Sequence, residues 1–316
     1  MSPASSLPEA SVATLAASPA QAATGLLAPE APGGLVPRLQ KLAASFASGP
    51  VSVAPLSPRA VDLVIPTAAP AELVEGQLRA LLGEAGAPVD VIVQPLRGRR
   101  KQLFLADMDS TMIGQECIDE LADFVGLKEQ VSAITERAMR GELAFEPALR
   151  ERVSLLRDLE LAVVDRIIAE RLTLNPGARE LVMTMRANGA HTCLVSGGFT
   201  VFTGPVSEKI GFHEHHSNVL EVVDGKLTGR VSGPVLGREA KLATLVRLRE
   251  QLGLPPEAVM AVGDGANDLD MLLEAGLGVA YYAKPAVAAA ARARIEHTDL
   301  TTLLFAQGYR EEEFVR

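Results

Sequence analysis

Two aspartates directly follow a short apolar run at residues 103–106. They are Asp107 and Asp109, and two hydroxyl residues, Ser110 and Thr111, come next. A short apolar run bounded by polar residues predicts a strand that is buried on both faces, as in a parallel sheet. Ligands bind beyond the carboxyl ends of such strands. Two carboxylates this close repel each other unless a cation or a shared proton is present, although the run alone also fits a helix cap or an Asx turn.

Three further polar groups lie at or beside the ends of expected strands more than 80 residues downstream. They are Ser196-Gly197, Lys241, and Gly263-Asp264-Gly265 with Asn267 and Asp268. Together with the aspartate pair they fit a phosphate monoester held on Mg²⁺, which prefers a few carboxylates plus waters and phosphate oxygens. We expect the magnesium ligands to be the carboxylates of Asp107 and Asp264 and the main-chain carbonyl of Asp109.

Each group then has a defined chemical role. Asp107 could attack phosphorus and form an aspartyl-phosphate, while Asp109 donates a proton to the leaving group and later accepts one from water. Ser196 and the amide of Gly197, at a helix N-terminus, suit a phosphate oxygen. Lys241 would stabilise the charge of the phosphoryl group during transfer.

The elements that must position these residues alternate between strands and helices. Expected strands cover 103–106, 191–195, 259–262 and 277–281, and expected helices cover 178–187, 241–252 and 285–295. This alternation predicts an α/β fold with a doubly wound parallel sheet. Asp224-Gly225 predicts a hairpin within a β-rich stretch at 213–235.

A purely helical stretch interrupts the alternation after the aspartate pair. Apolar residues at helical spacing predict helices at 116–125, 128–140, 145–159 and 162–171. We therefore expect a helical cap over the site, at about 115–174.

The N-terminal third contains no residue pattern of catalytic type. Residues 1–34 are rich in Ala, Ser and Pro and are expected to be flexible, whereas residues 35–96 predict a small α+β module with strands at 61–65 and 89–93 and a helix at 71–82. A basic linker at 97–101 is expected to start the catalytic domain, 97–316.

The composition narrows the class of protein. The chain has 316 residues, 48% of them hydrophobic, and a net charge of −9, which does not favour a nucleic-acid or membrane-surface partner. Two cysteines cannot build a disulfide framework. The first basic residue is Arg38, and no apolar run is long enough to span a bilayer. We therefore expect a cytoplasmic protein with a small-molecule substrate; its oligomeric state, a homodimer included, stays open.

The motif order resembles the haloacid dehalogenase superfamily, with its Asp-x-Asp-Ser-Thr start and Gly-Asp-Gly-x-Asn-Asp end. Three further features, Glu116, Phe145 with Arg152 in the helical insertion, and Ser196-Gly197-Gly198-Phe199, make residues 97–306 similar to bacterial, amino-terminally extended phosphoserine phosphatases. The resemblance implies Mg²⁺-dependent hydrolysis of O-phosphoserine, the last step of serine formation.

The resemblance also implies a role for each matching residue. Asp107 is the nucleophile and Asp109 the proton donor; Asp107, Asp109 and Asp264 hold magnesium; Glu116 and Arg152 bind the amino and carboxylate groups, and Phe145 is a further substrate-binding residue; Ser196, Gly197, Lys241 and Asn267 bind the phosphate; Ser110 and Asp268 support the site. At the N-terminus the chain departs from the pattern, because residues 1–60 contain fewer recognisable strands than an ACT-like regulatory module. We expect a reduced module there.

Other interpretations of single residues remain open from the sequence. Lys241 fits a solvated helix lysine, Arg152 one half of a surface ion pair, and Cys193 a small core residue. The histidines at 213, 215 and 216 resemble a metal cluster, but no Cys or second His group accompanies them along the chain, so a solvated hairpin edge is favoured. Alternative functions are a phosphatase or phosphotransferase for another small phosphorylated amino acid or alcohol, and a serine or phosphoserine sensor without turnover.

Overall fold

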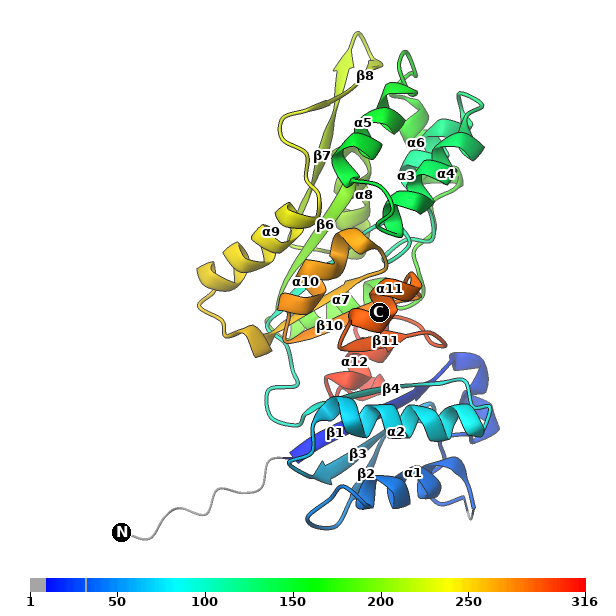
Figure 1. Ribbon diagram of the computed structural model, residues 1–316, viewed down its shortest axis with the longest axis vertical. Helices are drawn as coiled ribbons and strands as arrows, with labels where there is room; N and C mark the ends of the chain where they lie inside the picture. The colour runs from blue at the N-terminus through cyan, green and yellow to red at the C-terminus, as the bar shows by residue number, and fades with distance from the viewer. Residues whose placement is uncertain (1–9, 32) are drawn as a thin grey trace. The chain divides into compact units, whose positions relative to one another are not determined.

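The computed structural model describes residues 10–31 and 33–316, which form two compact units (Figure 1). The first unit contains the described residues up to 100 together with 293–314, and the second contains 101–292 with the last two residues. The expected catalytic domain, 97–316, therefore ends too late. The chain returns to the N-terminal unit after residue 292.

The first unit is built on a four-stranded antiparallel sheet in the order β2-β3-β1-β4. Its elements are β1 (Ala10–Ala17), α1 (Leu35–Ala44), β2 (Ser52–Ser57), β3 (Ala60–Pro66), α2 (Ala71–Glu84), β4 (Val89–Pro95), β11 (Ala293–Ile295) and α12 (Thr302–Ala306). The strands and the helix expected between residues 61 and 93 are present. Because β1, α1 and β2 precede them, the module has a complete βαββαβ order and is not reduced.

The expectation of a flexible segment at 1–34 is wrong for residues 10–17. These residues form β1, which pairs with β3 on one side and with β4 on the other, and Leu15 is completely buried. The strand consists mostly of Ala and Ser, which have low strand propensity, so its formation depends on pairing on both edges rather than on local preference. Residues 1–9 lie outside the described residues.

The two faces of this sheet have different partners. Leu15, Leu63 and Val91 belong to an apolar core with α1 and α2. The alternate residues include polar side chains, and Asp90 accepts hydrogen bonds from the amides of residues 296 and 297 and from the Thr298 hydroxyl at 2.9, 3.1 and 2.7 Å. These bonds hold the residues that directly follow β11. The prediction of a helix over 285–295 is wrong beyond residue 290, because α11 ends at Ala290 and residues 293–295 form β11.

The second unit contains the doubly wound sheet, with strands in the order β10-β9-β5-β6-β7-β8. Its elements outside the cap are β5 (Leu103–Ala106), α7 (Ala178–Ala187), β6 (His191–Phe199), α8 (Thr200–Ile210), β7 (Glu214–Val223), β8 (Lys226–Ser232), α9 (Arg238–Gln251), β9 (Val259–Gly263), α10 (Leu269–Glu274), β10 (Leu277–Tyr281) and α11 (Pro285–Ala290). The strands from β10 to β7 are parallel, and β7 and β8 form the antiparallel hairpin expected at Asp224-Gly225. The predicted fold class is confirmed.

The helical insertion leaves and rejoins this sheet at a single point. An antiparallel bridge joins Ile113 to Leu174, and the amide of Gly114 donates to the carbonyl of Thr173 at 3.0 Å. Between these ends lie α3 (Cys117–Asp123), α4 (Lys128–Met139), α5 (Phe145–Ser154) and α6 (Val163–Glu170), which Figure 1 shows grouped beside the β7–β8 hairpin. The insertion can therefore pack as a separate cap while its two ends stay fixed beside the aspartate pair.

Candidate active site

The register of three parallel strands brings the predicted site residues together. Ala106, the last residue of β5, is paired with Leu194 of β6 and with Val262 of β9. Asp107 therefore leaves the sheet between Ser196 and Asp264, which each lie two residues beyond those partners. Because parallel strands end at the same edge, residues separated by more than 150 positions converge on one point.

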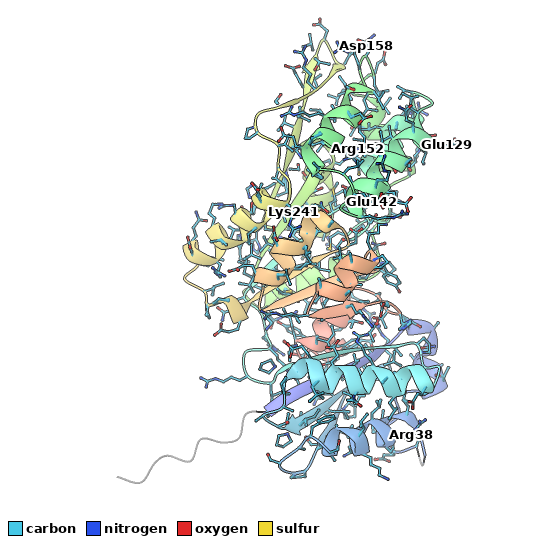
Figure 2. The ribbon with its side chains drawn as sticks, in the orientation of Figure 1. Arg38, Glu129, Glu142, Arg152, Asp158 and Lys241 are labelled. Atoms are coloured by element: carbon cyan, nitrogen blue, oxygen red, sulfur yellow. The ribbon has the colours of Figure 1, made fainter. Side chains whose placement is uncertain are left out.

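Lys241 is a buried cation at this site. It is completely buried, and its Nζ atom lies 2.7 Å from Oδ1 of Asp107 and 2.6 Å from Oδ1 of Asp268. Figure 2 marks its place on α9. Burial opposes its charge, but the two carboxylates raise the pKa of Lys241, so the ammonium stays protonated. The interpretation as a solvated helix lysine is excluded.

Asp268 shapes the loop that follows β9. Its Oδ2 atom accepts hydrogen bonds from the amides of Asp264 and Gly265, at 3.2 and 3.0 Å. A β-carbon at Gly263 would lie only 2.4 Å from Cγ of Asp268, so glycine is required there. With both oxygens already engaged, Asp268 orients the loop and Lys241.

The carboxylates fit a divalent cation. Oxygens of Asp107, Asp264 and Asp268 lie within 4.8 Å of one another, and all three residues are buried. Burial, together with the charge of Asp268, raises the pKa of Asp107 well above its usual range and that of Asp264 to about 7. One lysine does not neutralise this cluster, and hard oxygen donors are the ligands that Mg²⁺ prefers. The donor set therefore suits a hard metal ion.

Asp109 is held on two sides. Its Oδ1 atom accepts a hydrogen bond from the amide of Cys117 at 2.8 Å, and its Oδ2 atom accepts one from the Ser196 hydroxyl at 3.3 Å. Burial raises the pKa of the Asp109 carboxyl, although both hydrogen bonds lower it. The side chain is thus oriented by the cap on one side and by β6 on the other.

A carboxylate and a guanidinium from the cap line the same pocket. Glu116, the residue before α3, accepts a hydrogen bond from the Ser110 hydroxyl at 2.6 Å. Arg152 on α5 is 2% exposed and donates to the carbonyl of Ala148 at 3.0 Å and to the Thr135 hydroxyl at 2.9 Å (Figure 2). Burial raises the pKa of Glu116, as do the negative charges of the site, and burial lowers the pKa of Arg152. Arg152 is therefore not one half of a surface ion pair.

Phe145 lies over the last residues of β6. A β-carbon at Gly197 would lie 2.6 Å from Cζ of the Phe145 ring. Glycine at position 197 thus lets a cap residue touch the end of β6, which was predicted to bind phosphate. Asn267 completes the lining, and its buried Oδ1 atom has no hydrogen-bond partner among the described residues, which leaves part of this amide for a ligand.

The pocket also contains residues that sequence reasoning missed. Its lining comprises Asp107, Asp109, Glu116, Ile118, Met139, Phe145, Leu149, Arg152, Ser196, Gly197, Gly198, Phe199, Asp264 and Asn267. All the predicted site residues line it or bond directly to its lining. Phe145, Leu149 and Arg152 lie at helical spacing on α5, and this signal could have identified Leu149. Ile118 and Met139 come from α3 and α4 and carry no comparable signal.

Paired aspartates lie at the end of a central strand, next to a buried lysine and beside a helical cap. This arrangement defines a doubly wound α/β protein whose site suits a phosphate group. Over residues 104–273 the chain matches the haloacid dehalogenase-like hydrolases, and it belongs to this family. Within the part of the chain that the structure describes, no helix is long and apolar enough to cross a membrane.

Known relatives are similar to this chain over about seven tenths of its length. The chain is 43% identical over 228 residues to a phosphoserine phosphatase of Streptomyces coelicolor, which covers 72% of this chain and 55% of the relative. It is 45% identical over 224 residues to a phosphoserine phosphatase of a Polaromonas species, covering 69% and 95%. A solved structure described as a phospho-aspartyl intermediate analogue of phosphoserine phosphatase superposes with a TM-score of 0.62 at 43% identity, covering 65% of this chain and 98% of that one. The chain thus spans about half the length of the first relative and nearly all of the second.

Proposed function

We propose that this protein hydrolyses O-phosphoserine to serine and phosphate with the help of Mg²⁺, the last step of serine formation. One observation carries the substrate assignment: Glu116 and Arg152, a carboxylate and a guanidinium from the cap, line the pocket that also holds Asp107 and Asp109. A phosphorylated amino acid has an ammonium group that would pair with Glu116 and a carboxylate that would pair with Arg152. The names of the relatives support the same substrate.

Asp107 is the proposed nucleophile. Its carboxylate attacks phosphorus, the bond from phosphorus to the serine oxygen breaks, and an aspartyl-phosphate forms on Asp107. Lys241 fixes the carboxylate through a 2.7 Å contact and offsets the charge of the phosphoryl oxygens. Asp107, Asp264 and the main-chain oxygen of Asp109 would hold Mg²⁺, which would supply further charge neutralisation. The family's solved phospho-aspartyl analogue supports the covalent route.

Asp109 is the proposed acid and base. Its hydrogen bonds to the Cys117 amide and the Ser196 hydroxyl hold the carboxyl at the pocket wall next to Asp107. From there it gives a proton to the departing serine oxygen, and it then takes one from the water that cleaves the aspartyl-phosphate. Ser196, Gly197 and Asn267 bind the phosphate oxygens, and Phe145 covers them.

A phosphate-release assay on a panel of phosphomonoesters, with and without Mg²⁺, tests this function. The panel contains phosphoserine, phosphothreonine, phosphoethanolamine and glycerol 3-phosphate. We expect turnover only with Mg²⁺ and strongest for phosphoserine. A preference for an ester without a carboxylate would contradict the substrate assignment, and binding of phosphoserine without any phosphate release would show a sensor.

A further inference from the structure

A second cluster of metal-ligating side chains lies away from the catalytic pocket, on the sheet of the same unit. The sequence offered no cysteine beside the histidines at 213–216, but the fold supplies one, because β6 and β7 are neighbours. Cys193 of β6 is paired with Glu214 of β7, and Val195 is paired with His216. Residues 214–216 pair with β6 on one side only, because the pairing of β7 with β8 begins at Val219.

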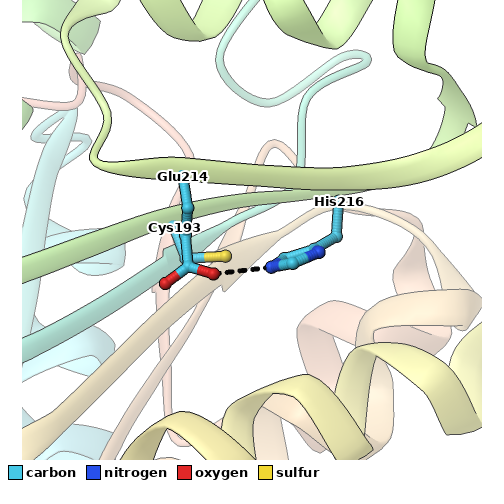
Figure 3. A group of neighbouring side chains, drawn as sticks. All are labelled: Cys193, Glu214 and His216. Carbon is cyan, nitrogen blue, oxygen red and sulfur yellow. Dashed lines mark hydrogen bonds and ion pairs between the residues drawn. The ribbon is translucent and has the colours of Figure 1, made fainter.

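Three different donor atoms converge at this place. Sγ of Cys193, a carboxylate oxygen of Glu214 and a ring nitrogen of His216 all lie within 4.8 Å of one another (Figure 3). Nε2 of His216 is 2.7 Å from Oε2 of Glu214. Figure 3 shows the thiol and the imidazole directed toward the same space beside the carboxylate.

We propose that Cys193, Glu214 and His216 bind a thiophilic divalent cation of the Zn²⁺ class. A thiolate, an imidazole and a carboxylate are the ligands of zinc, at about 2.3, 2.0 and 2.1 Å, and water takes the fourth tetrahedral position. Around such an ion, neighbouring ligand atoms are roughly 3.3–3.6 Å apart, so small side-chain shifts are sufficient. Mg²⁺ prefers oxygen ligands alone and is selected against.

A further histidine orients the carboxylate. Nε2 of His191 lies 2.6 Å from Oε1 of Glu214, the oxygen that faces away from His216. The His191 ring stacks on that of His213 with a centroid distance of 4.8 Å. Carboxylate–histidine pairs of this kind typically orient the ligands of protein metal sites. Glu214 thus has one oxygen fixed by a partner and one directed toward the proposed ion.

Arg247 of α9 competes with the ion. Its Nη2 atom lies 3.3 Å from Nε2 of His216 and 3.7 Å from Oε2 of Glu214, so a cationic group already stands beside two of the three donors. The arginine side chain is 44% exposed and can turn into solvent. Cys193 is completely buried, whereas Glu214 and His216 are half-buried, so the ion enters from their side. Binding replaces the thiol proton, which leaves to solvent.

Titration of the metal-free protein with Co²⁺, a spectroscopic substitute for Zn²⁺, tests the site. Saturating Mg²⁺ is present to occupy the oxygen ligands of the catalytic pocket. We expect the near-ultraviolet absorption of a cobalt–thiolate bond, at one ion per chain, and its disappearance when Zn²⁺ is added. Cys193→Ala should abolish the band, whereas Cys117→Ala, which removes the other buried cysteine, should keep it.

Two variants of less buried residues keep the test decisive if Cys193→Ala fails to fold. His216→Ala should weaken Co²⁺ binding by about tenfold or more. Arg247→Gln should strengthen it roughly fivefold, because a competing charge is removed. Absence of a thiolate band in the parent protein, a band that is lost only in Cys117→Ala, or equal affinities in the parent and in His216→Ala would each overturn the proposal.

Discussion

The hydroxyl of Thr135 lies 2.9 Å from Nη1 of Arg152, from which it accepts a hydrogen bond, and 2.9 Å from Oδ1 of Asp119, to which it donates one. Thr135 is 3% exposed and belongs to α4, while Asp119 and Arg152 belong to α3 and α5. Thr135 lies outside the pocket lining and reaches the site only through the arginine. It is therefore a positioning residue for the proposed carboxylate-binding group.

Thr135→Val should weaken the binding of phosphoserine without changing the chemistry. Loss of one hydrogen bond to a charged, buried group costs about 1.5–3 kcal/mol, or roughly 10- to 150-fold in kcat/KM. Most of the loss should fall on KM. Thr135→Ser keeps the hydroxyl and should recover most of the activity. Equal losses for phosphoserine and phosphoethanolamine would show that the residue supports the fold of the cap instead.

Replacement of Arg152 tests the proposed substrate carboxylate directly. Arg152→Ala should lower kcat/KM for phosphoserine by roughly 30- to several-thousand-fold, because the carboxylate is left desolvated and unpaired at a cost of about 2–5 kcal/mol. Phosphoethanolamine lacks that carboxylate, so its hydrolysis should change little. Arg152→Lys should recover only part of the preference, since a point charge cannot form two parallel hydrogen bonds.

The ratio of kcat/KM for the two substrates is the measured quantity in each Arg152 variant. A parent enzyme that prefers phosphoserine, together with an Arg152→Ala variant that has nearly lost the preference, would support the assignment. If Arg152→Ala slows both substrates equally, the arginine holds the cap or the phosphate rather than the carboxylate.

The covalent mechanism makes a separate prediction at Asp107. Asp107→Asn should abolish turnover while the protein stays folded, because the variant removes a charge that burial and Asp268 disfavour. Mass spectrometry of the parent enzyme, quenched in acid during turnover, should show a phosphate adduct on the peptide that contains Asp107. Full activity of Asp107→Asn, after deamidation has been excluded by mass, would rule out the aspartyl-phosphate.

The division into units predicts how the chain can be shortened. All proposed catalytic groups lie in residues 101–292, so a fragment of residues 97–316 should keep kcat within about tenfold, a barrier change of at most about 1.4 kcal/mol. The same fragment keeps residues 293–314 but loses the four-stranded sheet of the first unit, whose Asp90 binds Thr298. It should therefore aggregate more readily than a fragment of residues 97–292. A soluble, folded fragment without activity would show that the N-terminal unit completes the site.

Lys101 predicts a pH dependence of stability. Its side chain is 7% exposed and donates to the carbonyl of Glu257 at 2.9 Å, and burial lowers its pKa from 10.5 to about 8. Between these values the unfolded chain binds more protons than the folded one, so the stability rises with pH. Below pH 8 the buried, charged Lys101 amine lowers the free energy of unfolding by about 3 kcal/mol, and this penalty disappears as the pH rises to 10.5.

Urea unfolding of the parent and of Lys101→Met from pH 7 to 10.5 measures this effect. The variant should be more stable near pH 7, and the difference in the free energy of unfolding should shrink toward high pH. Gln at the same position provides a polar control without a titrating group. A difference that stays constant over this range would show that the Lys101 amine is solvated in the folded protein.

The sequence by itself determined the main fold class and predicted which residues gather at one site. The strand before Asp107, the loop from Gly263 to Asp268 and the helical insertion are local patterns of hydrophobicity and spacing. Such patterns act over a few residues, and they predicted a doubly wound sheet, which is confirmed. The roles of the site residues stay a prediction, although all of these residues line one pocket or bond directly to its lining.

Tertiary structure alone decided the features that depend on partners distant in the chain. Half of the residues of β1 are alanines, which have weak strand preference, and the strand forms because β3 and β4 pair with both of its edges. The end of the chain returns to the first unit because Asp90 binds its backbone amides. Likewise, Cys193 meets His216 only because β6 and β7 become neighbours. Strand pairing and the burial of polar groups are properties of the folded chain, and no short stretch of sequence encodes the partner.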